Sequence, residues 1–266
     1  MMGQAGTFPG EKVKRQADIF SGERGIVVRQ SAADQPEKNE RHIALVLMAS
    51  GYGRRYGSNK LLEEFRGRPL FVHALEQAAG GGAGSSCVVT RYPEIRDYVD
   101  RWKKAGRRDS MDGETLSEDR QFSRPVRTSV SSPVIRNTCV VWNSHPERGI
   151  SESLRLGLSA RPEADGCCFM VCDQPLLTSG TLRRMMKAFC RNPDAIFVCS
   201  DGRRRGNPVL FPKELFGELM QLTGDNGGRQ ILRKYPGRIR EIIAARPEEL
   251  CDIDSAKDLE FLKKSL

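Results

Sequence analysis

The sequence predicts an α/β protein in which buried parallel strands end in polar loops, and three observations support this class. The unbroken apolar run from Ile43 to Ala49 is typical of a parallel strand, which carries apolar residues on both of its faces. Residues 69–78 have apolar side chains at helical spacing, with Pro69 at the start. A second apolar run, residues 168–172, ends at Asp173, where open α/β sheets bind their ligands.

The same patterns predict the other elements in chain order. Strands are expected at residues 87–90, at 134–135 with 139–142, and at 195–200, and helices at 94–104 and 215–222. Ser151 or Ser153 is expected to begin a helix. Thr178 or Ser179 is expected to cap a helix that begins near Thr181. Asp254 is expected to cap the last helix.

Two segments lie outside these patterns. Residues 1–41 are polar and charged without sustained periodicity, which predicts a mostly disordered extension. Residues 105–132 are rich in charge, serine and glycine, which predicts a surface insertion. The folded domain is therefore expected to span residues 42–266, with this insertion inside it.

The amino-acid composition limits the kinds of molecule that the protein is expected to bind. The chain carries 43 Lys and Arg against 34 Asp and Glu, a net charge of +9 that favours anionic partners such as nucleotides or phosphorylated substrates. No DNA- or RNA-binding motif is present, so nucleic acid is not expected. No apolar run approaches the roughly 20 residues of a membrane helix, and residues 1–41 contain no secretory signal, which together predict a cytoplasmic protein. The eight cysteines form no Cys-x-x-Cys pair, and a zinc site is not expected.

The loop after the first strand has the composition of a polyphosphate site. Gly51, Gly53 and Gly57 allow backbone amides to approach a ligand closely, and Arg55 and Lys60 oppose its negative charge. The loop contains neither the Gly-x-x-x-x-Gly-Lys-Ser/Thr motif nor the third glycine of the dinucleotide fingerprint.

Residues 48–60 nevertheless resemble one family signature. The stretch Met48-Ala49-Ser50-Gly51-x-x-x-Arg55-x-Gly57-x-x-Lys60 is similar to that of the MobA-like nucleotidyltransferases, which attach nucleotides to the molybdenum cofactor. Four further blocks resemble this family in the same order, beginning at Asn143, Asp173, Gly206 and Gly224, and the chain ends in a similar terminal segment at residues 252–259. The resemblance implies a Rossmann-like three-layer α/β/α domain with a mostly parallel sheet.

The resemblance also implies roles for individual residues. Arg55, Lys60 and Asp173 are expected to be catalytic, and Asp173 is expected to bind Mg²⁺. Asp254 is expected to bind the metal as the alternative to its capping role, and Asp252 is the other candidate for this second position. The alternative role of Ser153 is to cap a helix. The alternative role of Asp225 and Arg229 is to form a structural salt bridge with each other. The expected nucleotide-binding residues are Met48, Ala49, Ser50, Gly51, Arg55, Gly57, Lys60, Asn143 and Ser153, and the expected acceptor-binding residues are Gly206, Asn207, Pro208, Asp225 and Arg229.

The implied reaction is transfer of a nucleotide from a nucleoside triphosphate to the phosphate of molybdopterin, with release of pyrophosphate. Asp173-Gln174-Pro175 favours CTP, whereas Ser50 fits neither the cytidylyl nor the guanylyl pattern, so GTP remains open as the nucleotide. A molybdoenzyme that receives the cofactor is an implied partner. Two different activities also fit these residues: a sugar-phosphate or isoprenoid-pathway cytidylyltransferase, and a nucleotide-binding chaperone without turnover.

Overall fold

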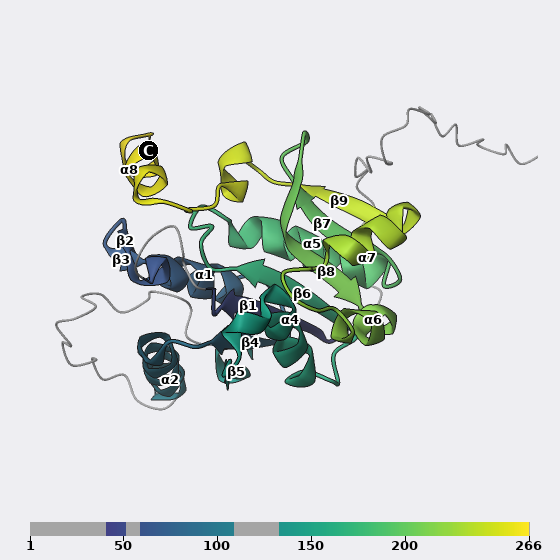
Figure 1. Cartoon of the computed structure of the whole chain (residues 1–266), viewed down its shortest axis with the longest axis horizontal. Helices are drawn as coiled ribbons and strands as arrows, with labels where there is room; N and C mark the ends of the chain where they lie inside the picture. The colour runs from purple at the N-terminus through teal and green to yellow at the C-terminus, as the bar shows by residue number, and fades with distance from the viewer. Residues whose placement is uncertain (1–40, 52–58, 109–132, 266) are drawn as a thin grey trace, which may run out of the picture.

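The protein is built on a seven-stranded sheet, seen in a computed structural model that describes residues 41–51, 59–108 and 133–265. The strand order is β5-β4-β1-β6-β8-β7-β9, with β1 near the middle (Figure 1). Of these strands, β8 is antiparallel to both of its neighbours, and every other pairing is parallel. The mostly parallel sheet is therefore confirmed. The strands are β1 (Ile43–Ala49), β4 (Ser85–Thr90), β5 (Thr138–Trp142), β6 (Gly166–Val171), β7 (Ile196–Ser200), β8 (Arg205–Pro212) and β9 (Ile239–Ile243).

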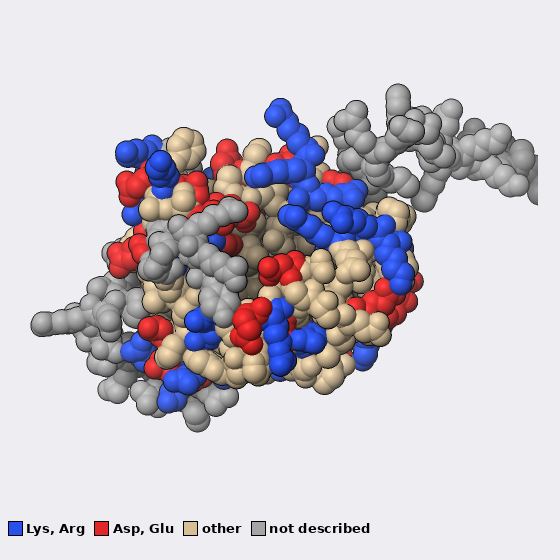
Figure 2. Space-filling model, viewed as in Figure 1, with Lys and Arg blue, Asp and Glu red and all other residues tan. Residues whose placement is uncertain are grey.

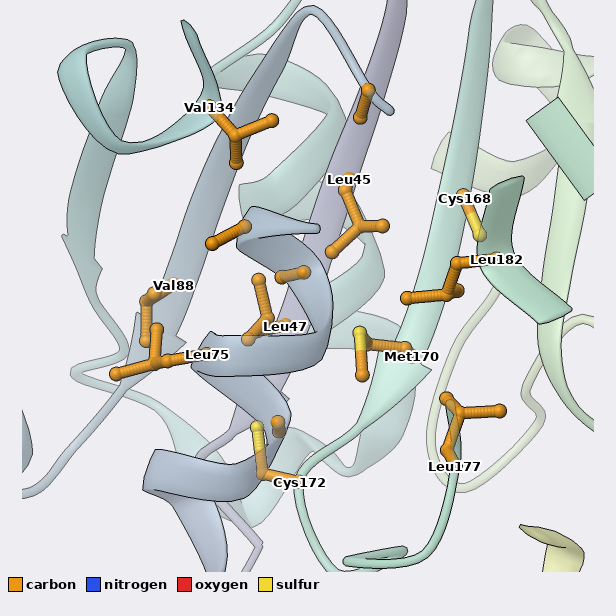
Figure 3. Packing of buried hydrophobic residues seen from close by; sticks show 14 of the residues in the cluster. Leu45, Leu47, Leu75, Val88, Val134, Cys168, Met170, Cys172, Leu177 and Leu182 are labelled. Carbon is orange, nitrogen blue, oxygen red and sulfur yellow. The ribbon is translucent and has the colours of Figure 1, made fainter. Parts of the chain in front are cut away.

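Helices cover both faces of this sheet, because β1 is apolar on both sides. Leu45 and Leu47 pack with residues of α1 and α5 on one face, as Figure 3 shows, whereas Val46 packs with residues of α4 on the other. The predicted three-layer arrangement is confirmed. The first face carries α1 (Leu70–Ala79), α2 (Pro93–Arg108), α3 (Pro133–Arg136) and α5 (Ser179–Arg191), and the second carries α4 (Ile150–Ser159), α6 (Phe216–Met220) and α7 (Arg229–Lys234).

A smaller apolar cluster holds the C-terminal segment against the domain. It joins a two-stranded hairpin, β2 (Glu64–Phe65) and β3 (Arg68–Pro69), to the last helix α8 (Ala256–Ser265). Its buried residues are Phe65, Leu70, Leu176, Ile253, Leu259 and Leu262. Short 3₁₀ helices connect the larger elements: η1 (Lys60–Leu62), η2 (Pro146–Arg148), η3 (Lys213–Leu215), η4 (Pro236–Arg238) and η5 (Pro247–Leu250).

Around residues 105–135 the structure differs from two of the predictions about secondary structure. The strand predicted at 134–135 is wrong, because Val134 and Ile135 lie in the one-turn helix α3, where both are buried in the cluster that contains α1 and α2. Two β-branched residues favour a strand locally, but their packing against helices decides the conformation. Helix α2 extends to Arg108, into the predicted insertion. Residues 109–132 and 1–40 lie outside the described residues.

The helix caps are only partly as predicted. Thr178 caps α5 as expected, since its hydroxyl accepts a hydrogen bond from the Thr181 amide at 3.2 Å. The cap role for Asp254 is wrong. Ser255 and Asp258 instead cap α8 reciprocally, with the Ser255 amide 2.7 Å from the Asp258 carboxylate and the Asp258 amide 3.3 Å from the Ser255 hydroxyl.

In the described part of the chain, no helix has the length and apolarity needed to cross a membrane.

Helix α4 lies unusually close to β1, which brings its N-terminal residues to the end of that strand. A Cβ atom on Gly157 would lie 2.5 Å from a methyl group of Val46, so only glycine fits between helix and strand.

Replacing Gly157 with alanine is therefore expected to destabilise the protein by about 1–3 kcal/mol through overpacking, despite alanine's better helix propensity. The matched control is Gly217→Ala in α6, where an added Cβ has no neighbour within 4 Å and should not destabilise. Urea unfolding measures both variants. Equal stability of the two variants would contradict the close packing of α4 on β1.

Candidate active site

Polar side chains follow the ends of three parallel strands of the sheet, β1, β5 and β6. Ser50 follows β1, Asn143 follows β5, and Asp173 lies two residues after β6. Because parallel strands end at the same edge of a sheet, these residues converge on one cavity of about 360 Å³. The cavity is lined by Met48, Ser50, Gly51, Lys60, Leu61, Asn143, Pro146, Glu147, Gly149, Ile150, Ser153, Val171, Cys172, Asp173 and Asp225.

A buried hydrogen-bond network joins three of the predicted nucleotide-binding residues. The Ser50 hydroxyl lies 2.7 Å from that of Ser153 and accepts a hydrogen bond from the Asn143 amide group at 3.1 Å. The Asn143 carbonyl oxygen accepts a bond from the His145 backbone amide at 3.0 Å, which sets the orientation of the side chain. Ser153 is the fourth residue of α4 and does not cap it, so the helix-cap role is wrong. The structure therefore brings these three residues together at the cavity.

The entrance of the glycine-rich loop is held by two residues that the sequence patterns did not indicate. The Thr90 hydroxyl donates to the Ala49 carbonyl at 3.0 Å, and the Tyr92 hydroxyl donates to the Gly51 carbonyl at 2.6 Å. Thr90 and Tyr92 lie about 40 residues along the chain and become neighbours only because β4 pairs with β1. The predicted site residues Arg55 and Gly57 lie outside the described residues.

Lys60 is the central cation of the described part of the site. Its ammonium lies 2.7 Å from an Asp173 carboxylate oxygen and 3.0 Å from one of Asp254. Burial alone lowers the pKa of Lys60, but the two carboxylates more than offset this effect and raise the pKa. Lys60 is therefore charged at neutral pH and joins three distant segments of the chain.

A third carboxylate extends this charged cluster. Asp252 accepts a hydrogen bond from the Gln174 side chain at 2.8 Å, and the Ile253 amide donates to the Asp173 carbonyl at 2.9 Å. Burial and the charge of Asp173 raise the pKa of Asp252. The C-terminal segment thus forms one wall of the site.

The carboxylate of Asp173 has the character expected of a metal ligand. One of its oxygens pairs with Lys60, and the other is buried with no hydrogen-bond partner among the described residues. Within residues 41–51, 59–108 and 133–265, no group of three or more His, Cys, Asp or Glu could hold a metal ion. A metal here would therefore need substrate phosphates or water to complete its coordination, as Mg²⁺ usually does.

The predicted acceptor-binding residues separate into two groups. Asp225 lines the cavity, and its loop packs so closely on Gly149 that a Cβ there would lie 2.5 Å from the Asp225 carboxylate. Asp225 and Arg229, both within the described residues, form no ion pair with each other, so the salt-bridge role is wrong. Gly206 pairs with Cys199 but Val209 pairs with Val198, which leaves Asn207 and Pro208 in a bulge of β8. Gly206, Asn207, Pro208 and Arg229 do not line the described cavity.

Gly228, next to the predicted acceptor-binding residue Arg229, packs against the core. A Cβ at this position would lie 2.6 Å from the ring of Phe211. Glycine is therefore required by the packing of this chain's own core.

The comparisons with known proteins agree with this geometry. A family model described as the MobA-like NTP transferase domain matches residues 45–239. The chain belongs to the MobA-like NTP transferase family. It is thus a nucleotidyltransferase of MobA-like type, and the cavity at the carboxyl edge of its sheet is the candidate active site.

Individual relatives of this nucleotidyltransferase are distant. A probable molybdenum cofactor guanylyltransferase of Bacillus subtilis is 22% identical over 82% of this chain and 94% of its own length. A nucleotidyl transferase from Methanothermobacter thermautotroptrophicus has a TM-score of 0.62 at 19% identity, covering 84% of this chain and 97% of its own. Rv0371c from Mycobacterium tuberculosis, solved as a complex with manganese, has a TM-score of 0.56 at 23% identity, covering 85% of this chain and all of its own. These structures share the fold.

The ion pairs of Lys60 lead to a stability prediction. Lys60→Met leaves the largely buried Asp173 carboxylate without its partner and should destabilise the nucleotide-free protein by about 3 kcal/mol. Asp254→Asn removes the partner that is 56% exposed and should cost less than about 1 kcal/mol. The double variant Lys60→Met/Asp173→Asn should be more stable than Lys60→Met alone. Urea unfolding measures all three, and wild-type stability of Lys60→Met would contradict the prediction.

Proposed function

We propose that this nucleotidyltransferase transfers CMP from CTP to the phosphate of molybdopterin, using Mg²⁺ and releasing pyrophosphate. The observation that carries the proposal is the Lys60–Asp173 pair beside a cavity whose polar wall is Ser50, Asn143 and Ser153. One side of this site holds a cation and a carboxylate suited to phosphates, and the other holds uncharged groups suited to a base.

The reaction requires positioning and charge neutralisation rather than a protein nucleophile. An oxygen of the acceptor phosphate attacks the α-phosphorus of the nucleotide, and the bond from that phosphorus to the pyrophosphate oxygen breaks. Lys60 would exchange its carboxylate partners for the phosphate oxygens and neutralise the charge that develops on them. Arg55 and the amides of the 49–57 loop would hold the triphosphate. Mg²⁺, held by Asp173 and Asp254, would supply further neutralisation of the phosphates.

The hydrogen-bond network supports CTP as the nucleotide. One of the two serine hydroxyls donates to the other, which leaves one hydroxyl hydrogen and the second amide hydrogen of Asn143 for a ligand. The Asn143 carbonyl oxygen is already engaged by the His145 amide. Cytosine presents two adjacent acceptors, O2 and N3, to such donors. The pairing edge of guanine presents one acceptor, O6, beside two donors, N1–H and the N2 amino group, so it matches two adjacent donors less well.

GTP is the second candidate nucleotide, because the Bacillus relative carries the name of a probable guanylyltransferase. The acceptor is proposed from family membership, and the cavity-lining Asp225 with the nearby bulge of β8 at Asn207 and Pro208 supplies groups to contact it. A molybdoenzyme that receives the product is the proposed downstream partner.

The first experiment measures pyrophosphate release with CTP, GTP, ATP and UTP in turn, using molybdopterin as acceptor with Mg²⁺. Release is expected with CTP, and Asp173→Ala should lower its rate at least 100-fold, because the α-phosphate loses its metal-mediated neutralisation. Release with GTP alone would assign the guanylyl activity instead. Nucleotide binding without release for any of the four would contradict the proposed reaction and favour a delivery role.

The second experiment tests the network. Ser50→Ala removes the hydroxyl that orders Asn143 and Ser153, and it should lower the CTP-to-GTP ratio of kcat/KM about tenfold, the equivalent of about 1.4 kcal/mol. Ser86→Ala is the matched control, because Ser86 is also buried and its hydroxyl lies 2.7 Å from another hydroxyl, that of Thr138, away from the cavity. An unchanged CTP-to-GTP ratio of kcat/KM in Ser50→Ala would show that the network does not select the base.

A further inference from the structure

A strongly basic surface lies outside the cavity, on the side of the sheet formed by β7, β8 and β9. Figure 2 shows Lys and Arg side chains gathered over the β7–β8 hairpin, β9 and α7, beside the central hollow of this face. We call this region the basic surface. Its residues are Arg203, Arg204, Arg205, Arg229, Arg233, Lys234, Arg238 and Arg240.

The fold assembles this surface from segments that are distant in sequence. β9 pairs with β7, and Arg205 at the start of β8 reaches Glu241 on β9 at 2.8 Å. Helix α7 is fixed over the same region because Ile231 packs in one cluster with Phe211 of β8. The guanidinium of Arg238 and the ammonium of Lys234 both lie over the ring of Tyr235.

Only half of the charge on the basic surface is neutralised by the described residues of the protein itself. Ion pairs join Arg204 to Asp201, Arg205 to Glu241, Lys234 to Glu218, and Arg238 to Glu214. The other four cations have no carboxylate partner among the described residues: Arg203, Arg229, Arg233 and Arg240. The first three of these are exposed. A protein gains nothing in stability from such uncompensated charge, which is typical of a binding surface.

The shape and chemistry of the surface favour a protein partner. None of its residues lines the described cavity, and the β7–β8 hairpin projects from the sheet (Figure 1), so the surface does not enclose a small ligand. Carboxylates such as Glu241 and Glu218 lie among the arginines and would repel a continuous phosphate backbone. Exposed arginines separated by acids instead match individual carboxylates of a protein, with which guanidinium groups pair bidentately.

We propose that the basic surface docks an acidic patch of a partner protein that delivers the acceptor or removes the product. This role of the partner rests on the proposed function, whereas the binding itself does not. Because the surface adjoins β8, whose bulge lies at the carboxyl edge of the sheet, a docked protein would sit next to the active-site cavity.

The test compares two charge-matched variants of the full chain. Arg203→Glu/Arg233→Glu changes the net charge of the basic surface by four units, and Lys263→Glu/Lys264→Glu makes the same change on exposed lysines of α8. Fluorescence anisotropy measures binding of labelled poly-L-glutamate, an acidic polypeptide, and of a 20-nucleotide single-stranded DNA at two salt concentrations. Circular dichroism and thermal unfolding verify that both variants are folded.

The wild type should bind poly-L-glutamate more tightly than DNA, with an affinity that falls as salt rises. The Arg203/Arg233 variant should bind poly-L-glutamate at least tenfold more weakly, and the α8 variant less than twofold more weakly. Equal losses in both variants would show that net charge alone acts and would overturn the proposal, as would tighter binding of DNA through the same arginines. Pyrophosphate release with free acceptor should be unchanged in the Arg203/Arg233 variant. Absence of release in the wild type would refute the proposed function without affecting the binding result.

Discussion

The parallel pairing of β5, β4, β1 and β6 is the constraint on which the rest of the structure depends. Parallel neighbours require crossover connections, and these place helices on both faces and bury every residue of β1 except the partly buried Met48. The same pairing makes the strand ends coincide at one edge, so that residues far apart in sequence share a cavity. Ser50, Asn143 and Asp173 are neighbours for this reason, and no local interaction between them is needed to bring them together.

The ion pairs of Lys60 hold the segments around the site together. Lys60 joins the segment after the glycine-rich loop to Asp173 after β6 and to Asp254 of the C-terminal segment. Its ammonium keeps the two carboxylates close in the absence of substrate, although they would otherwise repel each other. A polyphosphate with its cation would offer Lys60 and the carboxylates new partners of opposite charge. The resting ion pairs thus maintain the arrangement of charges that the reaction would use.

The predictions from sequence succeeded where a pattern was long or where several residues acted together. The buried strand at 43–49, the helix at 69–78 and Asp173 after an apolar strand all have the expected structure. They failed where a single short-range rule was applied to one or two residues. The segment predicted as a strand at 134–135 is a helical turn because Val134 and Ile135 pack against helices. Asp254 pairs with Lys60, and Ser255 caps α8 in its place. In each case a contact with a distant segment outweighed the local preference.

The sequence by itself determined the α/β class, the family and the types of residue at the site, because hydrophobic periodicity and the order of the signature blocks are properties of the chain. Only the tertiary structure decided which of those residues meet. It bonded Thr90 and Tyr92 to the loop entrance, placed Ser153 against Ser50, and left the described residues Arg229 and Asp225 without an ion pair to each other. It also gathered the basic surface from three segments. Such contacts depend on strand order and helix packing, which no spacing along the chain encodes.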